Sequence, residues 1–144
     1  MKRLSLWVCM CLAIGACHAS QIVARVSASD FYGTWTVTKI NAVSRVSESE
    51  ERMNALVGTV LTITADKVVE AGEDPCPIVK PYPIVSVVDT LDEVPIQAAP
   101  SPAAAGLPAR APMLDSGCLA IFKVGDHIVF GDRGAYYEAK RSMP

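Results

Sequence analysis

The chain has 144 residues, enough for one domain, and about half of them (51%) are apolar, which suits a globular core. Its 13 basic and 15 acidic residues give a formal net charge of −2 and form no basic patch. A nucleic-acid partner is therefore not expected.

The first element along the chain is an export signal over residues 1–19. A positive start is followed by the uncharged run LSLWVCMCLAIGA at Leu4–Ala16, which is shorter than the roughly 20 residues that a membrane-spanning helix needs. Two cleavage sites fit the sequence. A lipobox ending at Cys17 would leave a signal of 1–16 and an acylated cysteine, whereas a small-residue site would be cut before Ser20. Both predict an exported protein, which is either free in the periplasm or anchored at the outer membrane by its lipid.

The cysteines agree with export. Of the five, Cys9 and Cys11 leave with the signal, and Cys17 is either acylated or removed. Cys76 and Cys118 remain, and an even number in an oxidising compartment predicts one disulfide. It would close a loop of about 43 residues and stabilise the fold by up to roughly 4 kcal/mol. Two buried free thiols are the alternative, while a zinc site lacks partners. We expect no metal and no cofactor.

The folded domain is expected over residues 30–144, after a lead-in segment at 20–29. A strand is predicted at Thr34–Ile40, because Trp35 and Val37 share one face and threonines occupy the other. Threonine and β-branched residues suit a half-buried strand.

A short helix of about ten residues is predicted after this strand. Ser47 and Glu50 have the spacing of a capping box, and Gly58 stands where a left-handed C-terminal residue belongs. The apolar stripe expected on its buried face is Met53, Leu56 and Val57.

The middle of the chain predicts a hairpin from 59–64 and 67–71, then a strand at 84–88. Residues 89–94 fit one helical turn or a loop equally well. The Pro/Ala-rich segment 95–112 is expected to contain no interior strand, because each proline removes a ladder donor. So long a loop is either functional or mobile.

The C-terminal part predicts a three-stranded meander of 117–124, 127–130 and 135–141. Its turns are Gly125-Asp126 and the GDRG stretch at 131–134. With six or so strands, the fold class is all-β. We expect a small antiparallel β-barrel or half-barrel with one short α-helix after the first strand.

The tryptophan at the head of the first strand has a specific role in this fold. A large aromatic there can fold across the open end of a barrel, and Gly33 lets the chain pass close by. Arg141 shares strand parity with Tyr137 and Ala139, so its guanidinium is expected to stack on the Trp35 indole. Gly33, Trp35 and Arg141 are thus the predicted barrel-closing residues.

The stretch DFYGTW at residues 30–35 resembles the first lipocalin motif, whose companion is a late arginine over the tryptophan. The wider pattern resembles small exported proteobacterial envelope proteins of an uncharacterised family. It includes Val57-Gly58, the LDSGC stretch, and Tyr137 four residues before Arg141. The resemblance implies a lipocalin-like barrel, and it makes a small apolar ligand one candidate partner.

Catalytic motifs are missing from the sequence. His127 is the one imidazole well inside the predicted domain, and neither a G-x-S-x-G elbow, an H-E-x-x-H helix nor a phosphate loop occurs. Carboxylate pairs could form within two acidic groups, but we expect these to be solvated loop charges: Glu70, Glu73 and Asp74, and Asp89, Asp92 and Glu93. The chain is therefore predicted not to be an enzyme.

The resulting prediction is an exported, non-enzymatic binding protein of the bacterial envelope, in its sharpest form an inhibitor of an envelope protein such as a cell-wall hydrolase. Its rigid loops would enter the partner's cleft, with Lys80 and Tyr82 or Leu107 and Arg110 as contact residues. The alternatives are a lipocalin-like carrier of a small apolar ligand and a structural envelope lipoprotein. Membrane contact is expected only through the lipid anchor.

Overall fold

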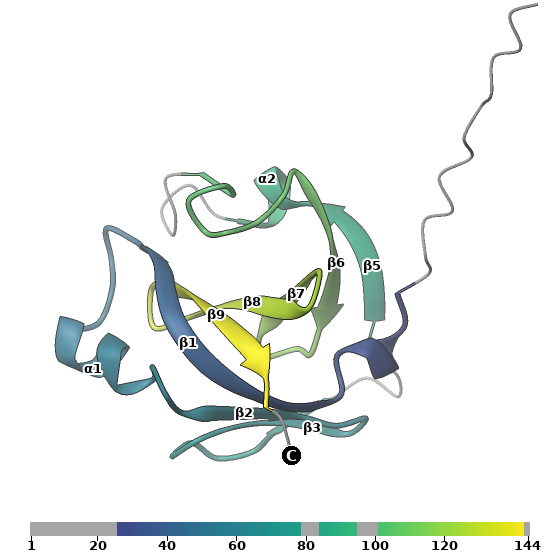
Figure 1. The fold of residues 1–144 in the computed structure, drawn as a ribbon, viewed down its shortest axis with the longest axis horizontal. Coiled ribbons are helices and arrows are strands. Elements are labelled where there is room, and N and C mark those ends of the chain that lie inside the picture. Colours follow the sequence, from purple (N-terminus) through teal and green to yellow (C-terminus); the bar gives the residue numbers. More distant parts are fainter. Residues whose placement is uncertain (1–25, 79–83, 95–100, 143–144) are drawn as a thin grey trace, which may run out of the picture.

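The computed structural model describes residues 26–78, 84–94 and 101–142. Its strands form one nine-stranded sheet in the order β4-β3-β2-β1-β9-β8-β7-β6-β5, with antiparallel neighbours throughout. Figure 1 shows that the sheet curls into a half-barrel. The elements are η1 Ala28–Asp30, β1 Gly33–Val43, α1 Glu50–Ala55, β2 Val60–Ile63, β3 Lys67–Glu70, β4 Cys76–Pro77, β5 Ile84–Asp89, α2 Thr90–Glu93, β6 Arg110–Asp115, β7 Ala120–Val124, β8 His127–Asp132 and β9 Ala135–Arg141.

The predicted all-β class, the short helix after the first strand, the β2–β3 hairpin and the C-terminal meander are confirmed. The sequence of this region fitted a helical turn or a loop equally well, and in the structure Thr90–Glu93 form a short helix. The strand number was wrong, because β4 and β6 were not predicted. β4 is only two residues long and contains a proline, so it carries no alternating pattern.

Strand β6 corrects the prediction that no interior strand lies in 95–112. It pairs with β5 along its whole length, and Pro112 stands opposite Val87. Its ladder with β7 begins only at Met113. Pro112 therefore has a strand neighbour on one side alone, so its missing N–H deprives the β7 ladder of nothing.

Curling of the sheet begins in β1, which is longer than predicted. The strand pairs with β2 in its first part and with β9 along most of its length. Its register against β9 shifts between Val37 and Lys39 and again between Ile40 and Ala42. Such bulges bend a strand and increase its twist, which lets the sheet wrap around its contents.

Helix α1 begins later than predicted. Ser49 is its N-cap, and the Ser49 hydroxyl accepts from the Arg52 amide at 3.4 Å. Ser47 was the predicted cap, but it lies before the helix. The helix contains six residues instead of the expected ten. Met53 and Leu56 are buried as predicted, whereas Val57 is 38% exposed because the helix has already ended.

Two hydrophobic clusters occupy the two faces of the sheet. The larger one fills the concave side with fully buried aromatic side chains, including Trp35, Phe130 and Tyr137. The smaller one lies under α2 and the segment after residue 101, around Phe122 and Tyr136. Neighbouring residues of one strand therefore enter different clusters, as strand periodicity requires.

Leu107 belongs to the smaller cluster and is 4% exposed, so the side chain expected to contact a partner is packed inside the protein.

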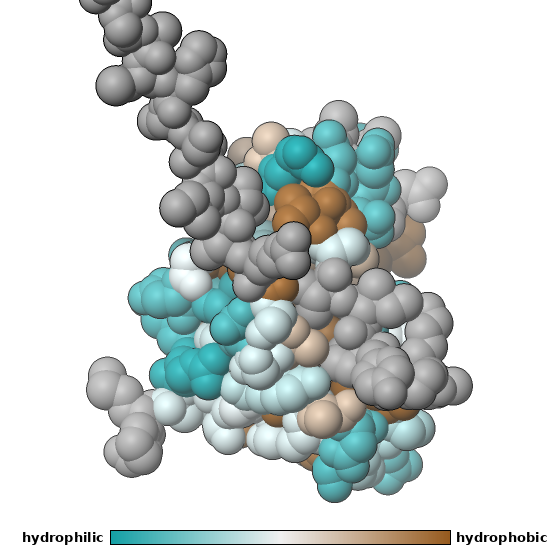
Figure 2. All heavy atoms as spheres, turned by 90° about the vertical axis from the view of Figure 1, so that its right-hand side faces the viewer, coloured by the Kyte–Doolittle hydropathy of each residue, from teal (hydrophilic) through white to brown (hydrophobic). Residues whose placement is uncertain are grey.

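Figure 2 shows the face that carries the sheet edge β5, where brown apolar groups lie between teal polar ones. Val87, which belongs to β5, is 47% exposed. In the described part of the chain, no helix is long and apolar enough to cross a membrane.

Candidate functional site

The predicted disulfide is present between Cys76 and Cys118, whose Cα atoms lie 6.4 Å apart. Cys76 belongs to the edge strand β4, and Cys118 lies in the turn between β6 and β7. The bond therefore joins one edge of the sheet to a turn near the opposite edge. It forms part of the wall of a pocket of about 390 Å³.

The turn that carries Cys118 is held by a buried serine. Ser116 is 1% exposed, and its hydroxyl donates to the Leu119 carbonyl at 2.9 Å. The same oxygen accepts from the amides of Leu119 at 2.9 Å and Cys118 at 3.3 Å. Gly117 takes a φ of +84°, which suits the residue at this corner. The LDSGC stretch thus fixes the position of the half-cystine.

Arg133 enters the pocket from the two-residue turn between β8 and β9. Arg133 and Gly134 have φ values of +52° and +76°, the signature of a type I′ hairpin turn. A Cβ on Gly134 would overlap the Val46 carbonyl and Ser47, so only glycine fits against that loop. The Arg133 carbonyl accepts from the Glu48 amide at 3.1 Å. Left-handed backbone is uncommon for arginine, and here it aims the guanidinium at a group of carboxylates.

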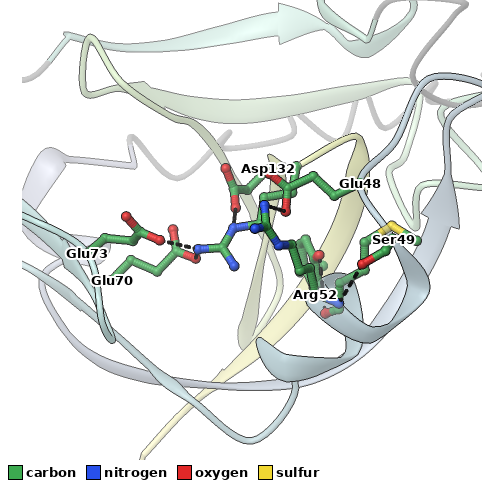
Figure 3. A network of polar contacts seen from close by, with 9 residues as sticks. Glu48, Ser49, Arg52, Glu70, Glu73 and Asp132 are labelled. Carbon is green, nitrogen blue, oxygen red and sulfur yellow. Dashed lines mark hydrogen bonds and ion pairs between the residues drawn. The ribbon is translucent and has the colours of Figure 1, made fainter.

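Three carboxylates surround this guanidinium. Arg133 pairs with Glu73, with Asp132 at 3.1 Å and with Glu70 at 3.9 Å. Figure 3 shows Glu70 and Glu73 on one side and Asp132 on the other, with Glu48 close by. Glu48 pairs with Arg52 at 3.8 Å. The negative charges around Arg133 therefore outnumber its single positive charge.

Burial makes this excess charge costly. The Glu70 side chain is only 10% exposed, and burial raises its pKa to about 7, with repulsion from Asp132 adding to the shift and Arg133 opposing it. Burial likewise raises the pKa of Asp132. Glu70 Oε1 and Asp132 Oδ2 are buried and receive no hydrogen bond in the described part of the chain. Arg133 Nε lies 3.1 Å from Asp132 Oδ2 and Arg133 Nη2 lies 3.9 Å from Glu70 Oε1, so both oxygens form ion pairs with Arg133 but no hydrogen bond.

The pocket therefore suits a cationic group. Of the three carboxylates, Glu73 is the most accessible, because its side chain is 57% exposed. The side chains of Glu70 and Asp132 are more deeply buried. Among the described residues, no group of three or more His, Cys, Asp or Glu is placed to hold a metal ion. A hydrogen-bonding organic cation, such as an ammonium or guanidinium, meets the demand for donors.

The predicted barrel-closing residues lie at the other end of β9. Trp35 is fully buried, and its indole N–H donates to the Phe31 carbonyl at 2.8 Å. The Arg141 guanidinium carbon lies 4.4 Å from the centre of the indole. A Cβ on Gly33, whose φ is +129°, would lie 2.7 Å from Arg141 Nη1. The structure thus brings Gly33, Trp35 and Arg141 together. They lie away from the pocket that Glu70, Glu73 and Asp132 line, which is called here the acidic pocket.

The remaining predicted site residues are scattered. Cys17, Lys80 and Tyr82 lie outside the described residues. Arg110 is exposed at the start of β6, apart from the acidic pocket. His127 faces Asp126 at 3.2 Å in a hairpin turn.

The sequence predicted that Glu70 is a solvated loop charge, which is wrong, because Glu70 lies at the end of β3 and its side chain is 10% exposed. The sequence analysis also did not identify Asp132 and Arg133 as its neighbours. Arg133 and Glu73 are 60 residues apart, so no local pattern links them. The one available signal was a charged Asp-Arg pair inside a glycine-flanked turn, which is an unusual place for an arginine.

The chain matches no protein-family model, and comparisons with curated proteins and with solved structures found no similar protein. What stands of the resemblance to lipocalins is the fold itself, a curled antiparallel half-barrel. The function must be argued from the geometry of the site.

Proposed function

We propose that this chain is an exported, non-enzymatic binding protein of the bacterial envelope that receives a lysine or arginine side chain of a partner protein in its acidic pocket. The observation that carries the proposal is Glu70. Its carboxylate is nine-tenths buried, lines the pocket, and has an oxygen without a hydrogen-bond donor. Buried carboxylates that lack donors are costly for a protein to keep without a use.

Charge favours a basic partner. If residues 1–19 are removed, Lys2 and Arg3 leave with them, and 11 basic residues then face 15 acidic ones. An incoming cation would meet Glu73 first, because this side chain is the exposed one. The added positive charge would favour the ionised form of Glu70 behind it, so binding would release a proton.

Binding fits the pocket better than catalysis does. A carboxyl group with a pKa of about 7 is suited to general acid–base work, but hydrolysis by covalent catalysis also needs a nucleophile beside it. Among the described residues that line the pocket, none supplies an imidazole, a hydroxyl or a free thiol as a nucleophile.

An apolar ligand inside the half-barrel is less favoured. The concave side is occupied by Trp35, Phe130, Tyr137 and their neighbours, all fully buried. The sharp form of the proposal is therefore an inhibitor, which binds a basic envelope enzyme such as a cell-wall hydrolase at the rim of the sheet. We further propose that the chain belongs to a family of small exported envelope proteins that resemble lipocalins.

The test combines capture with inhibition. Immobilised wild-type protein should retain a basic protein from an envelope extract, and Glu73→Gln should retain roughly tenfold less, because one charge-assisted contact is lost. Glu51→Gln, an exposed carboxylate on α1, is the matched control and should behave as wild type. The captured protein should lyse cell walls more slowly in the presence of the wild type.

Equal retention by all three proteins would show that binding does not use the pocket. A retained protein that is acidic, or lysis that the wild type leaves unaltered, would remove the inhibitor form.

A further inference from the structure

A second charged pocket lies at the end of β9 opposite Arg133. Lys123 near the end of β7 and Arg141 at the end of β9 both face the Trp35 indole. The Lys123 ammonium lies 5.2 Å from the ring centre, and the Arg141 guanidinium carbon lies 4.4 Å from it. Two cationic side chains therefore lie within cation–π distance of the same aromatic ring.

These cations have hydrogen-bonding capacity to spare. Arg141 donates to the Tyr32 carbonyl at 2.8 Å and to the Asp30 carbonyl at 3.0 Å. Lys123 donates to the Gly125 carbonyl. An arginine has five N–H donors and a lysine three, so most of the donors remain. Within residues 26–78, 84–94 and 101–142, neither side chain forms an ion pair with a carboxylate.

The cations border a pocket of about 610 Å³, whose wall also includes Val26, Ser29 and Pro112. Asp30 borders it too, but its carboxylate accepts from the Ser27 amide at 2.6 Å. Burial lowers the pKa of Lys123, and the charge of Arg141 lowers it further. The charges of Asp126 and Asp30 oppose this shift.

We propose that this pocket, called here the cationic pocket, binds a phosphate group between Lys123 and Arg141. An oxyanion there would receive donors from both side chains and would relieve their repulsion. The proposal is independent of the acidic pocket, since the two share no residue.

The phosphate could belong to a soluble anion or to a lipid headgroup. Val26 borders the cationic pocket, and Cys17 precedes it by nine residues. Those residues can span at most roughly 30 Å when fully extended. If Cys17 is acylated, the cationic pocket is held within that distance of a membrane surface, so headgroups form one arm of the test.

Tryptophan emission is a direct probe, because Trp35 is the only tryptophan outside the expected export signal. Titration of the exported protein with inorganic phosphate should change the emission in a saturable way. Lys123→Met keeps the packing of the side-chain stem, removes the charge and should weaken phosphate binding roughly tenfold. Lys140→Met, at the exposed neighbour of Arg141, should bind as wild type.

The second arm measures co-flotation with vesicles of phosphatidylglycerol and of phosphatidylcholine. A lipid anchor would act equally in wild type and variant, so a loss for Lys123→Met on phosphatidylglycerol alone assigns the site to headgroups. Saturable phosphate binding without that loss assigns it to a soluble anion. No saturable emission change together with no variant-dependent flotation overturns the proposal, as does equal weakening by Lys140→Met.

Discussion

At the scale of the residue, Gly33 shows how one backbone position decides an arrangement. Its φ of +129° is one that side chains strongly disfavour, and a Cβ there would lie only 2.7 Å from Arg141 Nη1. Only glycine therefore allows the arginine to lie over Trp35 while donating to the Tyr32 carbonyl.

Gly33→Ala should lower the free energy of unfolding by about 2–4 kcal/mol, from backbone strain and displacement of Arg141. Gly58→Ala is the control, because its φ is +90° and nothing lies within 4 Å of the added Cβ. It should cost about 1–2 kcal/mol. Urea unfolding followed by tryptophan emission measures both, and equal losses would show that the Arg141 contact has no role.

Glu70 links a single side chain to the pH dependence of stability. Its pKa is raised from 4.5 to about 7 in the folded protein, so the folded state holds the proton more tightly than the unfolded state. The contribution to stability is present in full below pH 4.5 and is lost as the pH rises through about 7. Glu70→Gln removes this titration.

Glu70→Gln should therefore be more stable than wild type by about 1–3 kcal/mol near pH 8.5 and nearly equal to it near pH 4. Denaturant unfolding at the two pH values measures the difference, with Glu51→Gln as the exposed control. A stabilisation that is the same at both pH values would contradict the assigned burial of the charge.

At the scale of the element, helix α1 shows why boundaries are hard to predict. Ser47 and Ser49 both stand two or three residues before acidic side chains, and the sequence favoured the earlier one as the cap. The turn at Gly134 packs against Ser47, and the Glu48 amide donates to the Arg133 carbonyl. These contacts hold the backbone at 47–48 outside the helix, so the cap moves to Ser49.

Ser49→Ala should cost about 1 kcal/mol of stability, because the Arg52 amide loses its acceptor. Ser47→Ala should change stability by less than about 0.5 kcal/mol, as expected for a surface position away from a cap. Thermal unfolding of the two variants distinguishes the caps, and the reverse order would restore the earlier helix start.

At the scale of the whole molecule, the disulfide compensates for an open sheet. In the described part of the chain the ladder order is linear, so β4 and β5 remain as edges. The Cys76–Cys118 bond spans from edge strand β4 to the β6–β7 turn and restrains the curl. The same bond lines the acidic pocket, so fold and site share one covalent link.

Replacing both cysteines with alanine should lower the free energy of unfolding by about 2–4 kcal/mol, because a loop with a sequence separation of 42 is no longer closed. Guanidinium unfolding of the variant measures this loss. Wild type kept in reductant should lose a similar amount, and a variant as stable as oxidised wild type would show that the ladders alone maintain the curl.

The sequence by itself determined the local features of this protein. Alternation at Trp35 and Val37, the glycine turns and the even pair of cysteines predicted the strands, the meander and the disulfide. These signals depend on residues that are near one another, or on simple counting, and they survive folding unchanged.

Only the tertiary structure decided which distant groups meet. Arg133 forms an ion pair with Glu73, which is 60 residues away in the sequence. Lys123 and Arg141 lie over the same indole ring. Leu107, expected at the surface, is buried in the smaller hydrophobic cluster. Each outcome depends on how far the sheet curls and on which face a strand presents. Single-sequence periodicity specifies the alternation of faces but not the partner across the barrel, and the charged pockets arise from that pairing.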